Sequence, residues 1–143
     1  MAVLEWDDSM AVGVYLIDEQ HKELVVLINN IADAVQSGAS VSEVSRFIRR
    51  FYNYTIVHFQ TEESLMDHNS YADYFTQVRE HLDCSTKALE FHRRFVEEAD
   101  FDLVEFLEYI VSWFRSHTTG IDQGLTEYLV GRGLVHLEKC GKA

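Results

Sequence analysis

The chain contains no proline in 143 residues, and this absence constrains the fold more than any other feature. Proline breaks helices because it lacks a backbone N–H donor and its ring clashes with the preceding turn. Glycines are few, and most lie near the ends of apolar segments. A chain with so few interruptions is typical of helical proteins. We therefore expect an all-α fold.

Apolar residues recur at steps of three and four, which is the spacing of one helix face. This pattern predicts four long helices over residues 19–36, 41–68, 72–98 and 101–130. Asp18 is the expected N-cap of the first helix, and Ser37-Gly38 its stop. Ser40 and Glu43 have the spacing of a capping box before the second. Because short connections favour antiparallel neighbours, we predict an up-down-up-down four-helix bundle forming one domain, residues 1–143.

Composition argues against several classes of function. The 24 acidic and 12 basic residues give a formal net charge of −12, which disfavours nucleic acid and anionic membrane surfaces as partners. No apolar run approaches the roughly 20 residues that cross a bilayer. The N-terminus lacks the basic start and apolar stretch of a signal peptide. With only two distant cysteines, Cys84 and Cys140, a reducing, cytoplasmic location is expected.

Each of the four predicted inner faces contains one histidine. These are His21, His58, His81 and His117. Burying a polar ring without partners costs about 1–3 kcal/mol, so four rings directed at one bundle axis need a common partner. Glu62 follows His58 by four residues and Gln77 precedes His81 by four, so each pair shares a helix face. Imidazoles with carboxylates suit iron, zinc, manganese or copper.

A second carboxylate, Asp122, follows His117 by five residues. At about 100° per residue, an α-helix would place it roughly 140° around the helix from His117. It reaches the same site only by a sideways approach or through a local irregularity such as a π-bulge, which Gly120 would ease. Two carboxylates among several imidazoles suit a pair of metal ions. The remaining histidines fall off the inner faces and are expected at the surface. These are His68, His92 and His136.

Three sequence blocks surround the candidate ligands. Residues 13–24 read GVYLIDEQHKEL, residues 58–66 read HFQTEESLM, and residues 113–117 read WFRSH, with Asp122 beyond. In this order they resemble the opening, HFxxEExLM and WxxxHxxxxD blocks of bacterial hemerythrins. Trp6-Asp7 also fits the N-terminal loop of that family. The resemblance covers nearly the whole chain.

The resemblance implies reversible dioxygen binding at two non-haem iron ions. By position, His21 and His58 would hold one iron, and Gln77, His81 and His117 the other. Glu62 and Asp122 would bridge the two ions together with a solvent-derived oxygen. Dioxygen would bind at the iron held by His21 and His58, in an apolar pocket that excludes water.

Two positions depart from the family pattern. Gln77 stands where the family has histidine, and an amide oxygen is a harder and weaker ligand than imidazole. Gln77 would either bind the second iron weakly or leave a position open to water, and both outcomes would loosen that ion. Thr118-Thr119-Gly120 is more polar than the usual apolar filling after the histidine, which indicates either tolerated small residues or a wetter oxygen pocket.

Four functions are compatible with these patterns. Reversible oxygen carriage, storage or supply is favoured, because no nucleophile, general base or substrate cleft stands out, and we expect no enzyme activity. An oxygen or redox sensor is the second. A di-iron oxidoreductase is the third, although the predicted inner faces lack the Glu-x-x-His repeats of ferritin-like sites. A mono-iron or iron-storage protein would follow if Gln77 is not a ligand.

Overall fold

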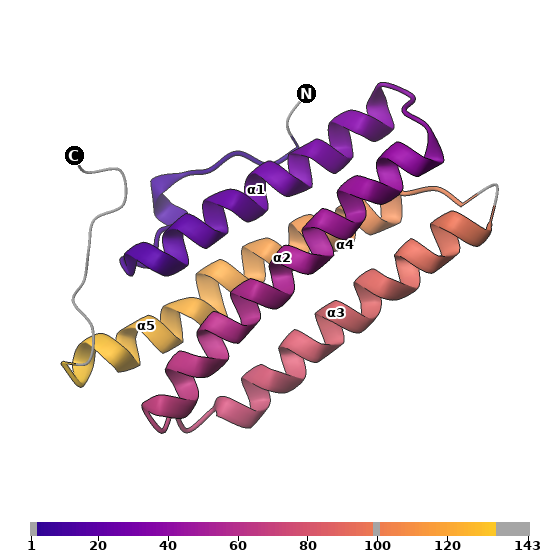
Figure 1. Cartoon of the computed structure of the whole chain (residues 1–143). Helices are drawn as coiled ribbons and strands as arrows, with labels where there is room; N and C mark the ends of the chain where they lie inside the picture. Colours follow the sequence, from indigo (N-terminus) through magenta and orange to yellow (C-terminus); the bar gives the residue numbers. More distant parts are fainter. Residues whose placement is uncertain (1–2, 99–100, 134–143) are drawn as a thin grey trace.

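The computed structural model describes residues 3–98 and 101–133, with the backbone alone for residues 121–123. Over this part of the chain, all regular elements are helical (Figure 1). In chain order they are the 3-10 helix η1 (Asp8–Met10), α1 (Tyr15–Gln36), α2 (Val41–His68), α3 (Tyr74–Glu97), α4 (Val104–Ser116), the π-helical segment η2 (His117–Ile121) and α5 (Asp122–Gly131). Within the described residues, no helix is both long and apolar enough to cross a bilayer.

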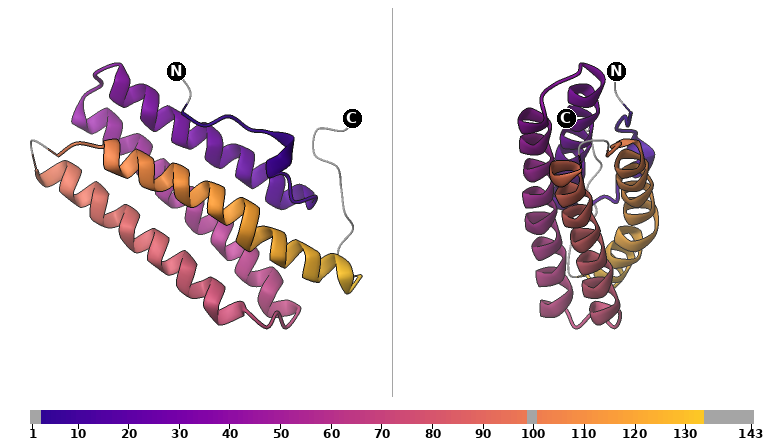
Figure 2. Two further views of the ribbon diagram at one scale, coloured as in Figure 1. Left: turned by 180° about the vertical axis from the view of Figure 1, so that it is seen from behind. Right: turned by 90° about the vertical axis from the view of Figure 1, so that its right-hand side faces the viewer.

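The long helices form an antiparallel bundle. α1 packs on α2, α2 packs on α3, and α4 contacts both α1 and α3. α1 and α3 therefore lie diagonally across the bundle, and α5 continues the line of α4 (Figures 1 and 2). The predicted all-α, up-down-up-down four-helix bundle is confirmed.

The junction between α1 and α2 follows its sequence signals. α1 ends at Gln36, and Gly38 adopts φ 73°, a left-handed conformation that glycine enters without a Cβ penalty. The hydroxyl of Ser40 then accepts a hydrogen bond from the backbone N–H of Glu43 at 3.2 Å. This bond satisfies one of the N–H groups that α2 leaves unpaired in its first turn.

The prediction that Asp18 is the N-cap of the first helix is wrong. α1 begins at Tyr15, so Asp18 lies inside its first turn and His21 lies well within the helix. The Asp18 carboxylate is buried and accepts hydrogen bonds from the backbone N–H groups of Val12 at 2.8 Å and Gly13 at 3.1 Å. Asp18 therefore fixes the preceding loop against the helix. Asp18 does lie at the start of the helix, but its carboxylate oxygens accept hydrogen bonds from the preceding loop and not from the first turn of the helix.

The last helix is also interrupted where a continuous one was expected. α4 ends at Ser116, residues 117–121 form a π-helical segment, and α5 resumes at Asp122. The π-bulge considered for residues 117–122 is therefore present. A π-helix bonds residue i to i+5, so residues five apart come to lie on one side of the helix.

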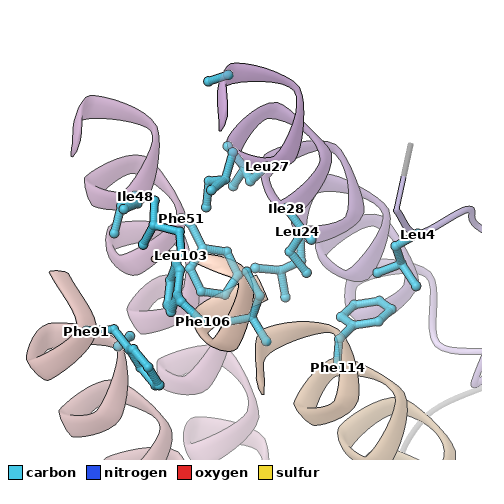
Figure 3. Close-up of a cluster of buried hydrophobic side chains, with 14 of the residues drawn as sticks. Leu4, Leu24, Leu27, Ile28, Ile48, Phe51, Phe91, Leu103, Phe106 and Phe114 are labelled. Carbon is cyan, nitrogen blue, oxygen red and sulfur yellow. The ribbon is translucent and has the colours of Figure 1, made fainter. Parts of the chain in front are cut away.

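Most of the apolar core fills one half of the bundle. Its largest fully buried members include Phe51, Phe106, Phe114, Ile28 and Leu24, contributed by α1, α2 and α4 (Figure 3). A smaller cluster lies beyond the candidate ligands along α2 and α5, and consists of Met66, Leu125 and Leu129. Along α2, His58 and Glu62 fall between Phe51 and Met66. The polar residues thus occupy the middle of the bundle.

Candidate metal centre

The side-chain oxygen Oε1 of Glu62 lies at the meeting point of three imidazoles. It is 3.1 Å from Nε2 of His117, 3.2 Å from Nε2 of His58 and 3.3 Å from Nε2 of His81. Glu62 is 1% exposed, and the three histidines are buried as well. One carboxylate, supplied by α2, is therefore shared by donors from α2, α3 and the π-helical segment.

The imidazole nitrogens also approach one another. Nε2 of His58 lies 3.1 Å from Nε2 of His21 and 3.0 Å from Nε2 of His117. One donor atom from each of His21, His58, Glu62 and His117 falls within 4.8 Å of all the others. Neutral imidazoles that turn Nε2 lone pairs toward one point, beside a carboxylate, match the donors that transition metals prefer. The residues present therefore fit a metal centre.

Two polar side chains orient the histidines from behind. Nδ1 of His58 lies 2.8 Å from Oε1 of Gln20, and Nδ1 of His81 lies 2.7 Å from Oε2 of Glu63. Because both partners are acceptors, they favour the tautomer with a proton on Nδ1, which turns the lone pair of Nε2 toward the centre. The amide of Gln20 in turn donates to Oγ1 of Thr61 at 3.0 Å.

Aromatic rings pack against the imidazoles and fix their planes. Phe59 stacks on His81 with ring centroids 4.1 Å apart, and Trp113 stacks on His117 at 4.9 Å. Phe114 meets the edge of His21 at 5.8 Å. These contacts surround the polar centre with apolar surface, which excludes water and strengthens electrostatic interactions inside it.

Gln77 is buried on the same face of α3 as His81, one turn earlier, and is 7% exposed. Its Oε1 has no hydrogen-bond partner among the described residues. A buried amide oxygen without a partner costs about 1–3 kcal/mol, so a ligand for this oxygen would offset that cost. This is the observation that favours Gln77 as a metal ligand.

The structure places the sequence-predicted residues as follows. Five of them converge through the distances given above, namely His21, His58, Glu62, His81 and His117. Gln77 is buried nearby on α3. Asp122 begins α5 after the π-helical segment, and its side chain lies outside the described part of the chain.

Of the other polar candidates, His68 is exposed, as predicted, and His136 lies outside the described residues. His92 is only half-buried and its Nε2 lies 2.6 Å from Oγ of Ser45, so it also serves to join α3 to α2. Cys84 is buried, and this burial raises the pKa of its thiol to about 12 despite a hydrogen bond with Tyr109. Such a thiol is an unreactive part of the core.

Sequence reasoning missed Gln20 and Glu63. Both stand next to a predicted ligand in the chain, Gln20 before His21 and Glu63 after Glu62. A residue adjacent to a ligand points about 100° away on the helix, toward the neighbouring helix rather than the axis. Nδ1 of a metal-binding histidine on the neighbouring helix needs an acceptor in that direction. A polar residue next to a predicted ligand could therefore have been predicted to orient such a histidine.

Comparison with known families agrees with this geometry. Residues 12–129 match the hemerythrin HHE cation binding domain. The chain belongs to the hemerythrin family. The family binds a non-haem di-iron centre with dioxygen as ligand, and the described residues provide a His/Glu cluster that could hold metal. The family and the cluster together indicate a di-iron, oxygen-binding domain.

Individual relatives extend over most of the chain. A bacteriohemerythrin of Pseudomonas aeruginosa (strain LESB58) is 31% identical over 128 residues, covering 89% of this chain and 82% of that protein. A bacteriohemerythrin of Stenotrophomonas maltophilia is 31% identical over 130 residues, with the same shares covered. A hemerythrin-like protein of Naegleria gruberi is 30% identical over 124 residues, covering 82% and 86%.

A crystal structure of wild-type hemerythrin has the same fold as this chain. It superposes with a TM-score of 0.80 at 22% identity, covering 93% of this chain and 98% of that one. At this identity the likeness supports the bundle alone, and the nature of the site rests on the family and on the residues described above.

Proposed function

We propose that this chain binds dioxygen reversibly at a pair of non-haem irons and that it carries, stores or supplies oxygen. The observation that best supports the proposal is the position of Glu62, whose Oε1 lies within 3.3 Å of three imidazole nitrogens from different segments. The proposed ligands are His21, His58, Glu62, Gln77, His81, His117 and Asp122.

Each group has a separate role in the proposal. His21 and His58 would hold one ion, Gln77, His81 and His117 would hold the other, and both ions would share Glu62 and Asp122. When bound, the iron pair supplies the redox chemistry that takes up and releases dioxygen. Gln20 and Glu63 keep Nε2 of His58 and His81 directed inward, and the aromatic rings keep bulk water out of the centre.

This function is favoured over catalysis because the centre is closed. Its imidazoles and Glu62 are buried, and the rings of Phe59, Trp113 and Phe114 cover them. A closed, histidine-rich centre suits holding a small ligand better than admitting a substrate. We therefore propose that the chain is not an enzyme. A cytoplasmic location also stays a prediction from the sequence.

The test is the iron content per chain together with the visible spectrum. Protein reduced without air is exposed to oxygen and then returned to an oxygen-free atmosphere. The proposal expects two irons per chain and an absorption band that appears with oxygen and disappears on its removal, over repeated cycles. A spectrum that changes once and does not return would contradict reversible binding.

The second candidate is a redox sensor or a di-iron oxidoreductase with a weakened second iron. Gln77 favours it, because this position would supply an amide oxygen to the second ion where the family supplies an imidazole. That oxygen has no hydrogen-bond partner among the described residues. Sustained consumption of peroxide in excess of iron would support an oxidoreductase. A single turnover would count against catalysis.

The role of Gln77 is tested by replacing it with histidine. If Gln77 binds the second iron, Gln77→His should tighten that iron against a chelator and slow autoxidation of the reduced protein. Gln77→Leu, which keeps the volume but removes the oxygen, should do the opposite. Unchanged iron retention in both variants would place position 77 outside the ligands.

A further inference from the structure

α3 presents a second apolar face, on the side that the bundle leaves exposed. Phe75, Leu82, Leu89 and Val96 are 81%, 63%, 47% and 54% exposed. They follow one another at intervals of seven residues and are called here the outer stripe of α3. The inward face of the same helix is separate, and its buried residues are Gln77, His81, Cys84, Ala88 and Phe91.

The regular spacing sets this stripe apart from scattered surface apolar residues. Single exposed leucines or valines are common on soluble proteins and need no explanation. A helix at the surface of a bundle normally keeps its outward face polar. Apolar residues repeated every seven positions instead form a band that drifts by about 20° per repeat around an α-helix, and two helices that supercoil about each other keep such a band in contact.

A shallow groove extends the apolar surface beside the stripe. It encloses about 250 Å³ between α2 and α3, and its walls include Ile56 of α2 and Val78 and Leu82 of α3. Leu82 therefore belongs both to the groove and to the stripe. A helix laid along the stripe would cover this groove as well, which adds to the apolar area removed from water.

The charge of α3 indicates what covers it. The whole chain has a formal charge of −12, which opposes association of two copies through most of its surface. α3 is an exception, because its basic and acidic residues are equal in number over Tyr74–Glu97. They are Arg79, Lys87, Arg93 and Arg94 on one side and Glu80, Asp83, Glu90 and Glu97 on the other. The charges of this helix therefore add little local repulsion to the approach of a second copy.

The stripe is also complementary to itself. Because its steps are equal, two antiparallel copies related by a two-fold axis place Phe75 against Val96 of the second copy and Leu82 against Leu89 of the second copy. Each layer then combines residues of similar total size, and the same patch serves both subunits, as closed dimers require. The contact runs for about 31 Å, at 1.5 Å per residue.

We propose that the outer stripe of α3 is the interface of an antiparallel, two-fold symmetric homodimer. The inference rests on the exposed stripe of α3 and on the groove that α3 forms with α2, and it does not require bound metal. It is tested by the mass of the iron-loaded full-length chain across a range of concentrations, by light scattering and sedimentation equilibrium. A dimer has twice the mass of the 16.6 kDa chain.

Leu82→Glu and Leu89→Glu should each convert the dimer to a monomer while helical content and iron per chain stay unchanged. Val26→Glu is the matched control, because Val26 is 50% exposed on α1, which lies diagonally opposite α3. It should leave the dimer intact. The proposal is overturned if the unsubstituted chain stays monomeric at all concentrations. It is also overturned if the dimer persists in Leu82→Glu.

The orientation of the two copies has its own test, with a short bis-maleimide cross-linker in a Cys140→Ser background. Thr86 lies beside the two-fold axis, so Thr86→Cys should cross-link to its own copy. Thr76 is also exposed, but it would lie about 28 Å from Thr76 of the second copy, so Thr76→Cys should not cross-link. Equal cross-linking at both positions indicates a parallel pair, and either that result or no cross-link at Thr86 overturns the antiparallel arrangement.

Discussion

The two halves of the bundle bury very different chemistry within the same four helices. In one half, Phe51, Phe106 and Ile28 are fully buried among apolar neighbours. In the other, between the middle of the bundle and the smaller apolar cluster, the helix faces carry Glu62, the histidines and Gln77 at the same inward positions. The first half gains stability from burial alone. The second half removes polar groups from water and depends on their partners to offset the cost.

Because of this difference, burial of apolar side chains should stabilise one half of the bundle, and metal binding should stabilise the other. The apolar half should fold to the same extent with or without metal, because nothing in it binds an ion. The polar half should depend on metal, because ligand binding to the native state alone raises the free energy of unfolding. Variants placed in each half therefore test whether the halves are as independent as their composition suggests.

The largest effect is expected from the polar half, on replacing the shared carboxylate. Glu62→Ala should remove both irons, because three imidazoles lose their common neighbour, and His58→Ala should do the same. Iron per chain and thermal unfolding with and without a chelator provide the measurements. The chelator should lower the melting temperature of the original chain but not of Glu62→Ala. Glu108→Ala, at an exposed position on α4, is the control. Two irons retained in both variants would disprove the assigned site.

The next effect belongs to the apolar half. Phe106 is fully buried and packs against Phe91 with ring centroids 5.4 Å apart. Phe106→Ala should lower the free energy of unfolding by about 3–5 kcal/mol, the cost of emptying such a position. Denaturant titration should give the same loss for metal-free and iron-loaded protein. A loss that depends on metal would show that the two halves are coupled.

A smaller effect is expected at the start of α2, at the apolar end of the bundle. Ser40→Ala removes the hydrogen bond to the N–H of Glu43 and should cost about 1 kcal/mol of unfolding free energy. Ser42→Ala, at an exposed position in the first turn of the same helix, should cost nothing comparable. An equal loss in both variants would mean that the cap contributes little.

The smallest effect concerns the acid side of the stability curve. Burial, together with the charge of Arg49, lowers the pKa of His92 below its ordinary value of 6.5. The unfolded chain therefore takes up a proton at this position before the folded one does, so stability declines as the pH falls through 6.5. In metal-free protein, His92→Gln should make this decline shallower between pH 7 and pH 5. An unchanged slope would mean that His92 titrates alike in both states.

The pattern of apolar residues was sufficient to predict the bundle, because helix periodicity and the missing prolines act locally. The start of α1 was not predictable in the same way. Tyr15 and Leu16 are exposed, so the first turn carries no inward pattern, and Asp18 looks the same whether it caps a helix or a loop. Whether Asp18 caps the helix or holds the loop depends on the path of residues 12–14, which the local sequence does not determine.

The candidate ligands were found because polar residues interrupt apolar faces. The supporting residues were not, since Gln20 and Glu63 act across helix pairs and a single helix face does not reveal them. The outer stripe of α3 escaped for a related reason. Its residues recur at helical spacing as core residues do, and only their exposed fractions distinguish an outward stripe from part of a broad core-facing surface.

The π-helical segment has a consequence for how the chain tolerates changes in length. A π turn holds one residue more than an α turn, so residues 117–121 amount to a single inserted residue in an otherwise regular helix. Deleting Gly120 would let the backbone close into continuous α-helix while the residues beyond it kept their faces, because four residues of α-helix take the place of five residues of π-helix. Closing the segment without a deletion would instead rotate everything beyond it by about 100°, and Leu125 and Leu129, now buried, would turn out of the bundle. In this stretch the π turn, rather than any one side chain, keeps α5 in register with the core.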